Sequence, residues 1–141
     1  MVKVELEEIA VSGDENQFLA LLRSPDGEIL PIQIDALQAI SIAAGRSSET
    51  LDRPLTHDLM ISVLELLGAS ISRVEVTDLV DGTYYAMLVL DRSDVSFEVD
   101  SRPSDALALA VRVHAPIFVS EHVLEQSALR DEFGGSGGAE A

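Results

Sequence analysis

Two tight turns, each set between segments of alternating apolar and polar residues, limit the folds open to this chain. One is Pro25-Asp26-Gly27, where Pro presets φ and Gly permits a positive φ, and the other is Asp81-Gly82. The flanking segments, which have the two-residue period of β-strands, are residues 17–23, 28–34, 70–80 and 83–90. Because turns this short join antiparallel neighbours, we expect two hairpins.

Other segments with a strand-like period extend the expected sheet. Residues 2–11 alternate, with a slip of phase at Glu7-Glu8 that predicts a bulge. Residues 95–100 alternate as well, and residues 116–119 form a short apolar run. The chain is therefore predicted to be rich in strands along its whole length.

Helices are expected between these groups of strands. Asp35 and Thr56 are suitable N-caps, Pro103 suits a first helical turn, and Gly45 and Gly68 are typical of helix ends. The predicted helices cover residues 36–44, 57–67, 103–113 and 121–126. This order predicts one α+β domain over residues 1–126, with a mostly antiparallel or mixed sheet and three to four short helices. A flexible, Gly-rich tail is expected over residues 127–141.

Charge and composition narrow the possible functions. The 141 residues carry a formal net charge of −16, which weighs against non-specific nucleic-acid binding because that binding needs cations. The acidity favours either solubility and repulsion between monomers or adaptation to a salty cytoplasm. There is no cysteine, which excludes disulfides and thiolate metal sites. No apolar run is long enough for a membrane span and the start of the chain does not resemble a signal peptide, so we expect a cytoplasmic protein.

Three motifs follow one another along the chain. They are GEILPIQI at residues 27–34, RPLTHDLM at 53–60, and EVDSRPSDALALA at 98–110 with PIFV at 116–119. In order and spacing, from about residue 2 to residue 124, they resemble the bifunctional nuclease domain family. The resemblance implies a compact α+β domain that self-associates to a homo-oligomer. It also implies hydrolysis of DNA and RNA, an activity attached to some members.

The third motif places charged groups where a strand is expected to end and a helix to begin. Glu98 and Asp100 are two apart, so both carboxylates project from one strand face and can hold Mg²⁺ or Mn²⁺. Arg102 can clamp a phosphate beside the free N–H groups of the helix N-terminus, and Ser104 is a further predicted substrate contact. Asp105 is a candidate metal ligand or catalytic base. Purely structural roles are equally open. Glu98 and Asp100 can form the solvent-exposed face of an edge strand, Asp105 can cap its helix, and Arg102 can pair with either acid of the strand.

The second motif supplies another set of candidates in Arg53, His57 and Asp58. His57 and Asp58 fall in the first turn of the predicted helix, the end that attracts anions. A histidine there can act as a general acid or base near neutral pH, Asp58 is a candidate catalytic group or metal ligand, and Arg53 is a candidate substrate contact. The alternative for Asp58 is capping of the first turn, which suits aspartate well.

Tyr84 and Tyr85 are adjacent on a predicted strand and therefore point to opposite faces of the sheet. At most one of them can serve as a platform on which a nucleic-acid base stacks. Packing in the core or at an interface is the alternative for both.

These observations leave two functional hypotheses. The first is a nuclease that hydrolyses phosphodiester bonds of DNA or RNA with the help of a divalent metal, and it requires that the two motifs converge in space. The second is a non-catalytic, oligomeric regulatory module that binds an anion or a protein partner in a pocket between the two helix N-termini. The charge of −16 favours the second hypothesis.

Overall fold

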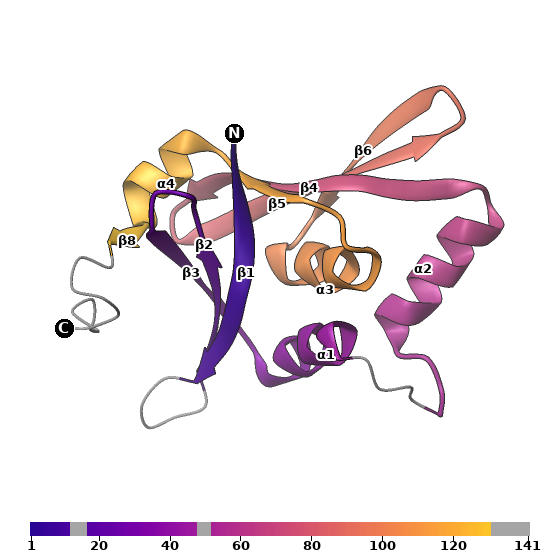
Figure 1. Ribbon diagram of the computed structural model, residues 1–141, viewed down its shortest axis with the longest axis horizontal. Coiled ribbons are helices and arrows are strands. Elements are labelled where there is room, and N and C mark those ends of the chain that lie inside the picture. Colours follow the sequence, from indigo (N-terminus) through magenta and orange to yellow (C-terminus); the bar gives the residue numbers. More distant parts are fainter. Residues whose placement is uncertain (12–16, 48–51, 131–141) are drawn as a thin grey trace.

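A mixed β-sheet is the framework of the computed structural model, which describes residues 1–11, 17–47 and 52–130 (Figure 1). Within these residues the sheet has eight strands in the order β6-β5-β4-β7-β1-β2-β3-β8. All neighbours are antiparallel except β4 and β7, which are parallel. The strands are β1 (Val2–Val11), β2 (Phe18–Arg23), β3 (Glu28–Ile34), β4 (Ala69–Val80), β5 (Thr83–Arg92), β6 (Val95–Ser101), β7 (Ile117–Val119) and β8 (Leu129–Arg130). The predicted α+β class is confirmed.

Strand β1 joins the two parts of the sheet. Its first residues pair with β7, and its residues from Glu5 onward pair with β2. The register shifts between Leu6 and Glu8, at the position where the sequence predicts a bulge. After the shift Ile9 packs against the core, as Val2 and Leu6 do before it.

The two predicted hairpin turns lie where expected, and a third hairpin projects from the body of the molecule. Asp81 and Gly82, between β4 and β5, have φ values of 51° and 81°, the left-handed conformations that a two-residue turn of this kind requires. Strands β5 and β6 continue past the helices as an extended arm (Figure 1). No residue of β6 is buried.

Three of the helices gather on one side of strands β4 and β5, whereas α4 lies on the other side in the view of Figure 1. The helices are α1 (Ala36–Arg46), α2 (Thr56–Leu66), α3 (Pro103–Val113) and α4 (Glu121–Ser127). Helix α3 is central and buries most of its length against the sheet. The fully buried large side chains are aliphatic: Leu22, Leu30, Ile42, Leu107, Leu109, Val74, Val76, Val119 and Val123.

Three details differ from the sequence-based expectations. Gly45 lies inside α1, which continues to Arg46. Thr56 is the first residue of α2 rather than its cap, and Asp58 accepts a hydrogen bond from the backbone N–H of Leu55 at 2.9 Å instead. The structured domain extends beyond residue 126, because Ser127 ends α4 and β8 pairs with β3. The rest of the expected tail, residues 131–141, lies outside the described residues.

The helices in the described ranges are all too short or too polar to cross a membrane.

Candidate active site

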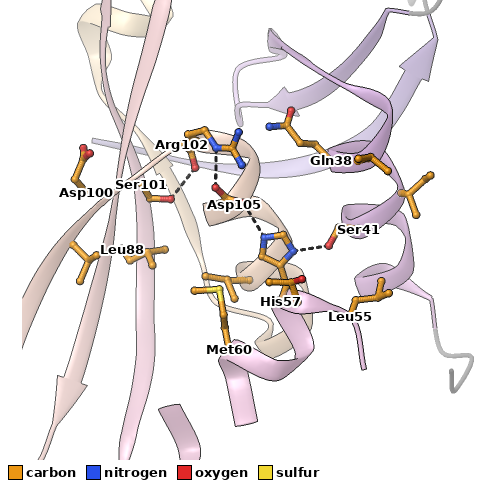
Figure 2. Close-up of a pocket in the computed structure, with 15 residues that line it drawn as sticks. Gln38, Ser41, Leu55, His57, Met60, Leu88, Asp100, Ser101, Arg102 and Asp105 are labelled. Atoms are coloured by element: carbon orange, nitrogen blue, oxygen red, sulfur yellow. Dashed lines mark hydrogen bonds and ion pairs between the residues drawn. The ribbon is translucent and has the colours of Figure 1, made fainter. Parts of the chain in front are cut away.

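A cavity of about 780 Å³ opens where three segments distant in sequence meet. Helix α1 supplies Gln38 and Ser41, the start of α2 supplies His57, and the corner between β6 and α3 supplies Arg102 and Asp105 (Figure 2). The second and third sequence motifs therefore converge, as the nuclease hypothesis requires. The apolar part of the wall is formed by Leu37, Ile40, Leu55, Met60, Leu88, Val99 and Leu109.

A chain of charged hydrogen bonds crosses this cavity. Nε of Arg102 donates to Oδ2 of Asp105 at 2.9 Å, and Oδ1 of Asp105 lies 2.9 Å from Nε2 of His57. Side-chain exposure falls along the chain, from 67% for Arg102 to 32% for Asp105 and 13% for His57. The carboxylate thus orients an almost buried imidazole on one side and an exposed guanidinium on the other.

The other ring nitrogen of His57 is held by a residue that sequence analysis did not single out. Nδ1 lies 2.6 Å from Oγ of Ser41, a hydroxyl on the buried face of α1. A carboxylate only accepts hydrogen bonds, so with Asp105 ionised Nε2 carries a proton. In the neutral ring Nδ1 then accepts from the Ser41 hydroxyl. The network fixes both the tautomer and the plane of the imidazole.

The same contacts shift the pKa values of two groups. Burial pushes the pKa of Asp105 upward, but the hydrogen bonds from Arg102 and His57 outweigh it, and the net pKa is lowered. The hydrogen bond to Asp105 raises the pKa of Arg102. Both groups are therefore charged over the whole physiological range.

Asp58, the neighbour of His57, turns away from the cavity and fastens α2 to α3. Its Oδ1 accepts a hydrogen bond from Nε of Arg112 at 2.7 Å. Arg112 is nearly buried, at 6% side-chain exposure, and also donates to the backbone oxygens of Ser41 and Ala108. The hydrogen bond from Arg112 lowers the pKa of Asp58. Asp58 therefore does not line the cavity but holds Arg112, which in turn donates to Ser41.

The two carboxylates predicted on β6 do not join this network. Val99 pairs with Leu88, which faces the helices, so Glu98 and Asp100 point to the other face of the strand. Glu98 is exposed and does not line the cavity. Asp100 reaches its rim, well apart from His57 in Figure 2.

Two predicted substrate contacts also lie outside this cavity. Arg53 is exposed in the segment before α2. Ser104 is buried at 5% exposure and lines a neighbouring cavity that also reaches Arg102.

The described residues contain no cluster of three or more histidine and carboxylate side chains that could hold a metal ion. This excludes a ready-made cage within those ranges, but Mg²⁺ is often bound by one or two carboxylates together with the phosphates of the substrate. Both carboxylate oxygens of Asp105 are already engaged. Asp100 is the remaining carboxylate that lines the cavity, and its side chain projects from the face of β6 opposite to that of Val99.

Comparison with known proteins places these motifs in a family. The model of the bifunctional nuclease domain matches residues 20–132. Two uncharacterized proteins from strains of Mycobacterium tuberculosis are 42% identical over 130 residues, which is 92% of this chain and 77% of theirs. Bifunctional nuclease 2 of Arabidopsis thaliana is 32% identical over 117 residues, covering 78% of this chain but 35% of its own length. The chain thus spans about a third of that plant relative.

Proposed function

This chain belongs to the bifunctional nuclease domain family, and from that premise we propose that it is a nuclease that hydrolyses phosphodiester bonds of DNA, RNA or both. The observation that carries the proposal is the hydrogen-bonded chain from Arg102 through Asp105 to His57 on the wall of one cavity. It combines an exposed cation, which can offset charge on a phosphate, with a histidine whose tautomer is fixed, which can act as a general base.

Arg102 is the phosphate-binding group in this proposal. Its Nε is bound to Asp105, and within the described residues its two terminal nitrogens have no hydrogen-bond partner. A guanidinium in this state can bind two phosphate oxygens and offset the charge that grows on them during hydrolysis. The surrounding protein is strongly acidic, so this local cation also defines where a polyanion can approach.

His57 is the proton-exchanging group. The Ser41 hydroxyl passes its proton to Nδ1 as it takes one from the attacking water, and Asp105 stabilises the imidazolium that forms. The water oxygen bonds to phosphorus, one ester P–O bond breaks, and the leaving sugar oxygen takes up a proton. Mg²⁺ or Mn²⁺, which we propose is held by Asp100 and the substrate phosphate, would add positive charge at that phosphate.

The test is cleavage of labelled single-stranded DNA and RNA by the purified protein with Mg²⁺, with Mn²⁺ and with EDTA, at low and high salt. We expect metal-dependent cleavage that falls about 100-fold or more in Arg102→Ala and in His57→Ala. Arg92→Ala, at the far end of the β5–β6 arm, is the matched control and should cleave normally. Equal cleavage by all folded variants would assign the activity to a contaminant.

Two further variants test the metal assignment. Asp100→Asn should raise the Mg²⁺ or Mn²⁺ concentration needed for half-maximal cleavage, because it removes the rim carboxylate. Glu98→Gln should not, because Glu98 does not line the cavity whereas Asp100 does. Cleavage that is unchanged by EDTA would overturn the role of the metal while leaving the nuclease proposal in place.

An oligomeric binding module is the second candidate, favoured by the apolar surface on α2 and β6. No residue of α2 is buried, and the exposed fractions reach 86% for Leu66, 54% for Leu59 and 46% for Val63, with 47% for Phe97 on β6. A patch of this kind is typical of an interface. We propose that a second copy of the chain covers it, because contacts between apolar side chains do not set like charges against each other in two acidic chains.

Light scattering over a range of concentrations tests this interface. Leu66→Glu combined with Val63→Glu should convert a dimer or larger assembly to a monomer. A wild-type chain that is monomeric at every concentration would contradict self-association. If the chain is oligomeric and no nucleic acid is cleaved under any condition, the binding-module function replaces the nuclease.

A further inference from the structure

A second cavity of about 550 Å³ adjoins the candidate active site. Arg102 and Gln38 line both cavities, so the two spaces meet at the guanidinium that is proposed to hold the phosphate. The far wall combines Pro31 and Ile32 of β3 with Tyr84 at the start of β5. A nucleic-acid strand with one phosphate at Arg102 would place its next nucleoside at this wall.

Tyr84 presents a fixed ring in the second cavity. Its hydroxyl donates to the backbone oxygen of Pro31 at 3.4 Å, a contact that joins β5 to β3, which are not neighbours in the sheet. The ring is partly buried and packs against the core. Tyr85 points to the other face of β5 and is 43% exposed. A ring held in one orientation beside an open cavity is a suitable stacking face for a base.

Ser104 is a second, independent sign of a ligand in this cavity. It is 5% exposed and lines the same space. Within the described part of the chain its hydroxyl makes no hydrogen bond. Buried hydroxyl groups normally have a partner, so an unpaired one at a cavity wall is suited to bind a polar group of a ligand.

We propose that the second cavity binds the nucleobase next to the phosphate held by Arg102, with Tyr84 as the stacking face and the Ser104 hydroxyl as a hydrogen-bond partner. This assignment rests on the proposed nuclease function. A base is neutral, so its binding carries no electrostatic penalty in a chain of net charge −16. The volume lies within the range of about 300–1,000 Å³ usual for small-molecule sites.

Stacking on a tyrosine is tolerant of sequence because every base has a flat aromatic face. The subsite would therefore favour single strands, whose bases are free, over duplexes. It would accept both DNA and RNA, since neither Tyr84 nor Ser104 needs to contact the sugar.

Tyrosine fluorescence tests base binding without requiring cleavage, because the chain has two tyrosines and no tryptophan. Tyr85→Phe leaves Tyr84 as the reporter, and Tyr84→Phe leaves Tyr85 as the matched control. Adenosine 5′-monophosphate should quench the first variant in a saturable manner and not the second, and ribose 5-phosphate, which has no base, should quench neither. Equal quenching of both variants would overturn the subsite.

Cleavage of an oligonucleotide with one abasic residue beside the scissile phosphate tests the same site in the reaction. The wild-type chain should cleave it about tenfold more slowly than the normal substrate, and Tyr84→Ala should cleave both at the reduced rate. If the normal and abasic oligonucleotides were cleaved at the same rate, and Tyr84→Ala did not change that rate, the subsite would be overturned and the nuclease function would stand. Saturable quenching of the Tyr85→Phe variant without cleavage of any substrate would overturn the nuclease function and leave the base-binding subsite intact.

Discussion

Helices α2 and α3 have the same length, 11 residues, and both are rich in apolar side chains, yet the protein uses them in opposite ways. Helix α3 buries seven residues: Pro103, Ser104, Ala106, Leu107, Ala108, Leu109 and Ala110. Helix α2 buries none. Apolar surface holds α3 in the core, whereas on α2 only Ile61 and Leu64 are partly buried against the core, and the helix has a second source of support.

Polar contacts at its N-terminal end hold α2 in place. His57 bonds to Asp105, and Asp58 bonds to Arg112, so both links run from the first turn of α2 to α3. The same end of α2 carries the histidine of the candidate site. The comparison indicates that the core and the site are stabilised by different forces, and substitutions can separate them.

The largest expected effect is on the buried helix. Leu109→Ala removes a fully buried side chain of α3 and should lower the free energy of unfolding by about 3 kcal/mol. Leu66→Ala, at 86% exposure on α2, should change it by less than about 0.5 kcal/mol. Urea unfolding of the wild-type chain and of each variant, at a protein concentration low enough to keep the chain monomeric, measures both values. Similar losses of unfolding free energy for Leu109→Ala and Leu66→Ala would contradict the distinction between the two helices.

A smaller effect is expected when the polar link is cut. Asp58→Ala leaves the nearly buried guanidinium of Arg112 without its carboxylate and should cost about 2 kcal/mol. Glu65→Ala, an exposed acid near the end of α2, is the control and should be close to neutral. If Asp58→Ala were also neutral, α2 would have to be held by its apolar face after all.

The smallest effect, and the most specific, is on the pH dependence of stability. The pKa of Asp58 is lowered from its ordinary value of 3.8, chiefly by the hydrogen bond from Arg112, so the native state binds fewer protons than the unfolded state. The stability that the contact with Arg112 contributes is fully present above the pKa of Asp58 in the unfolded chain. It is lost as the pH falls through the lower pKa of Asp58 in the native state. The difference in unfolding free energy between wild type and Asp58→Asn should therefore shrink below pH 3.8. A difference that is constant from pH 7 to pH 3 would contradict this.

The fold was largely predictable because its signals are local. The bounds of β3 and α3 match the predicted ones, since a Pro-Asp-Gly turn precedes the strand and Pro103 begins the helix. The bulge in β1 appears as a phase slip in the sequence. Strand β8 could not be predicted, because two residues carry no period and depend on pairing with β3.

The site was predictable in its motifs but not in its connections. Periodicity showed that Glu98 and Asp100 share a face, but which face meets the helices is decided by pairing with β5. Ser41 and Arg112 were missed because each sits singly within an apolar helical segment, where a polar residue has no distinctive pattern. Their roles arise only when α1, α2 and α3 are brought together.

Gly45 shows how closely two of these helices approach. A Cβ added there would lie 2.6 Å from Nη1 of Arg112 and 2.7 Å from Cγ2 of Val111, too close for either atom to stay in place. Any larger side chain would have to displace the side chains of Val111 and Arg112, and Arg112 is the group that donates to Ser41 and Asp58. A residue that does not line the cavity thus decides, by having no side chain, where the cation behind Ser41 and Asp58 can lie.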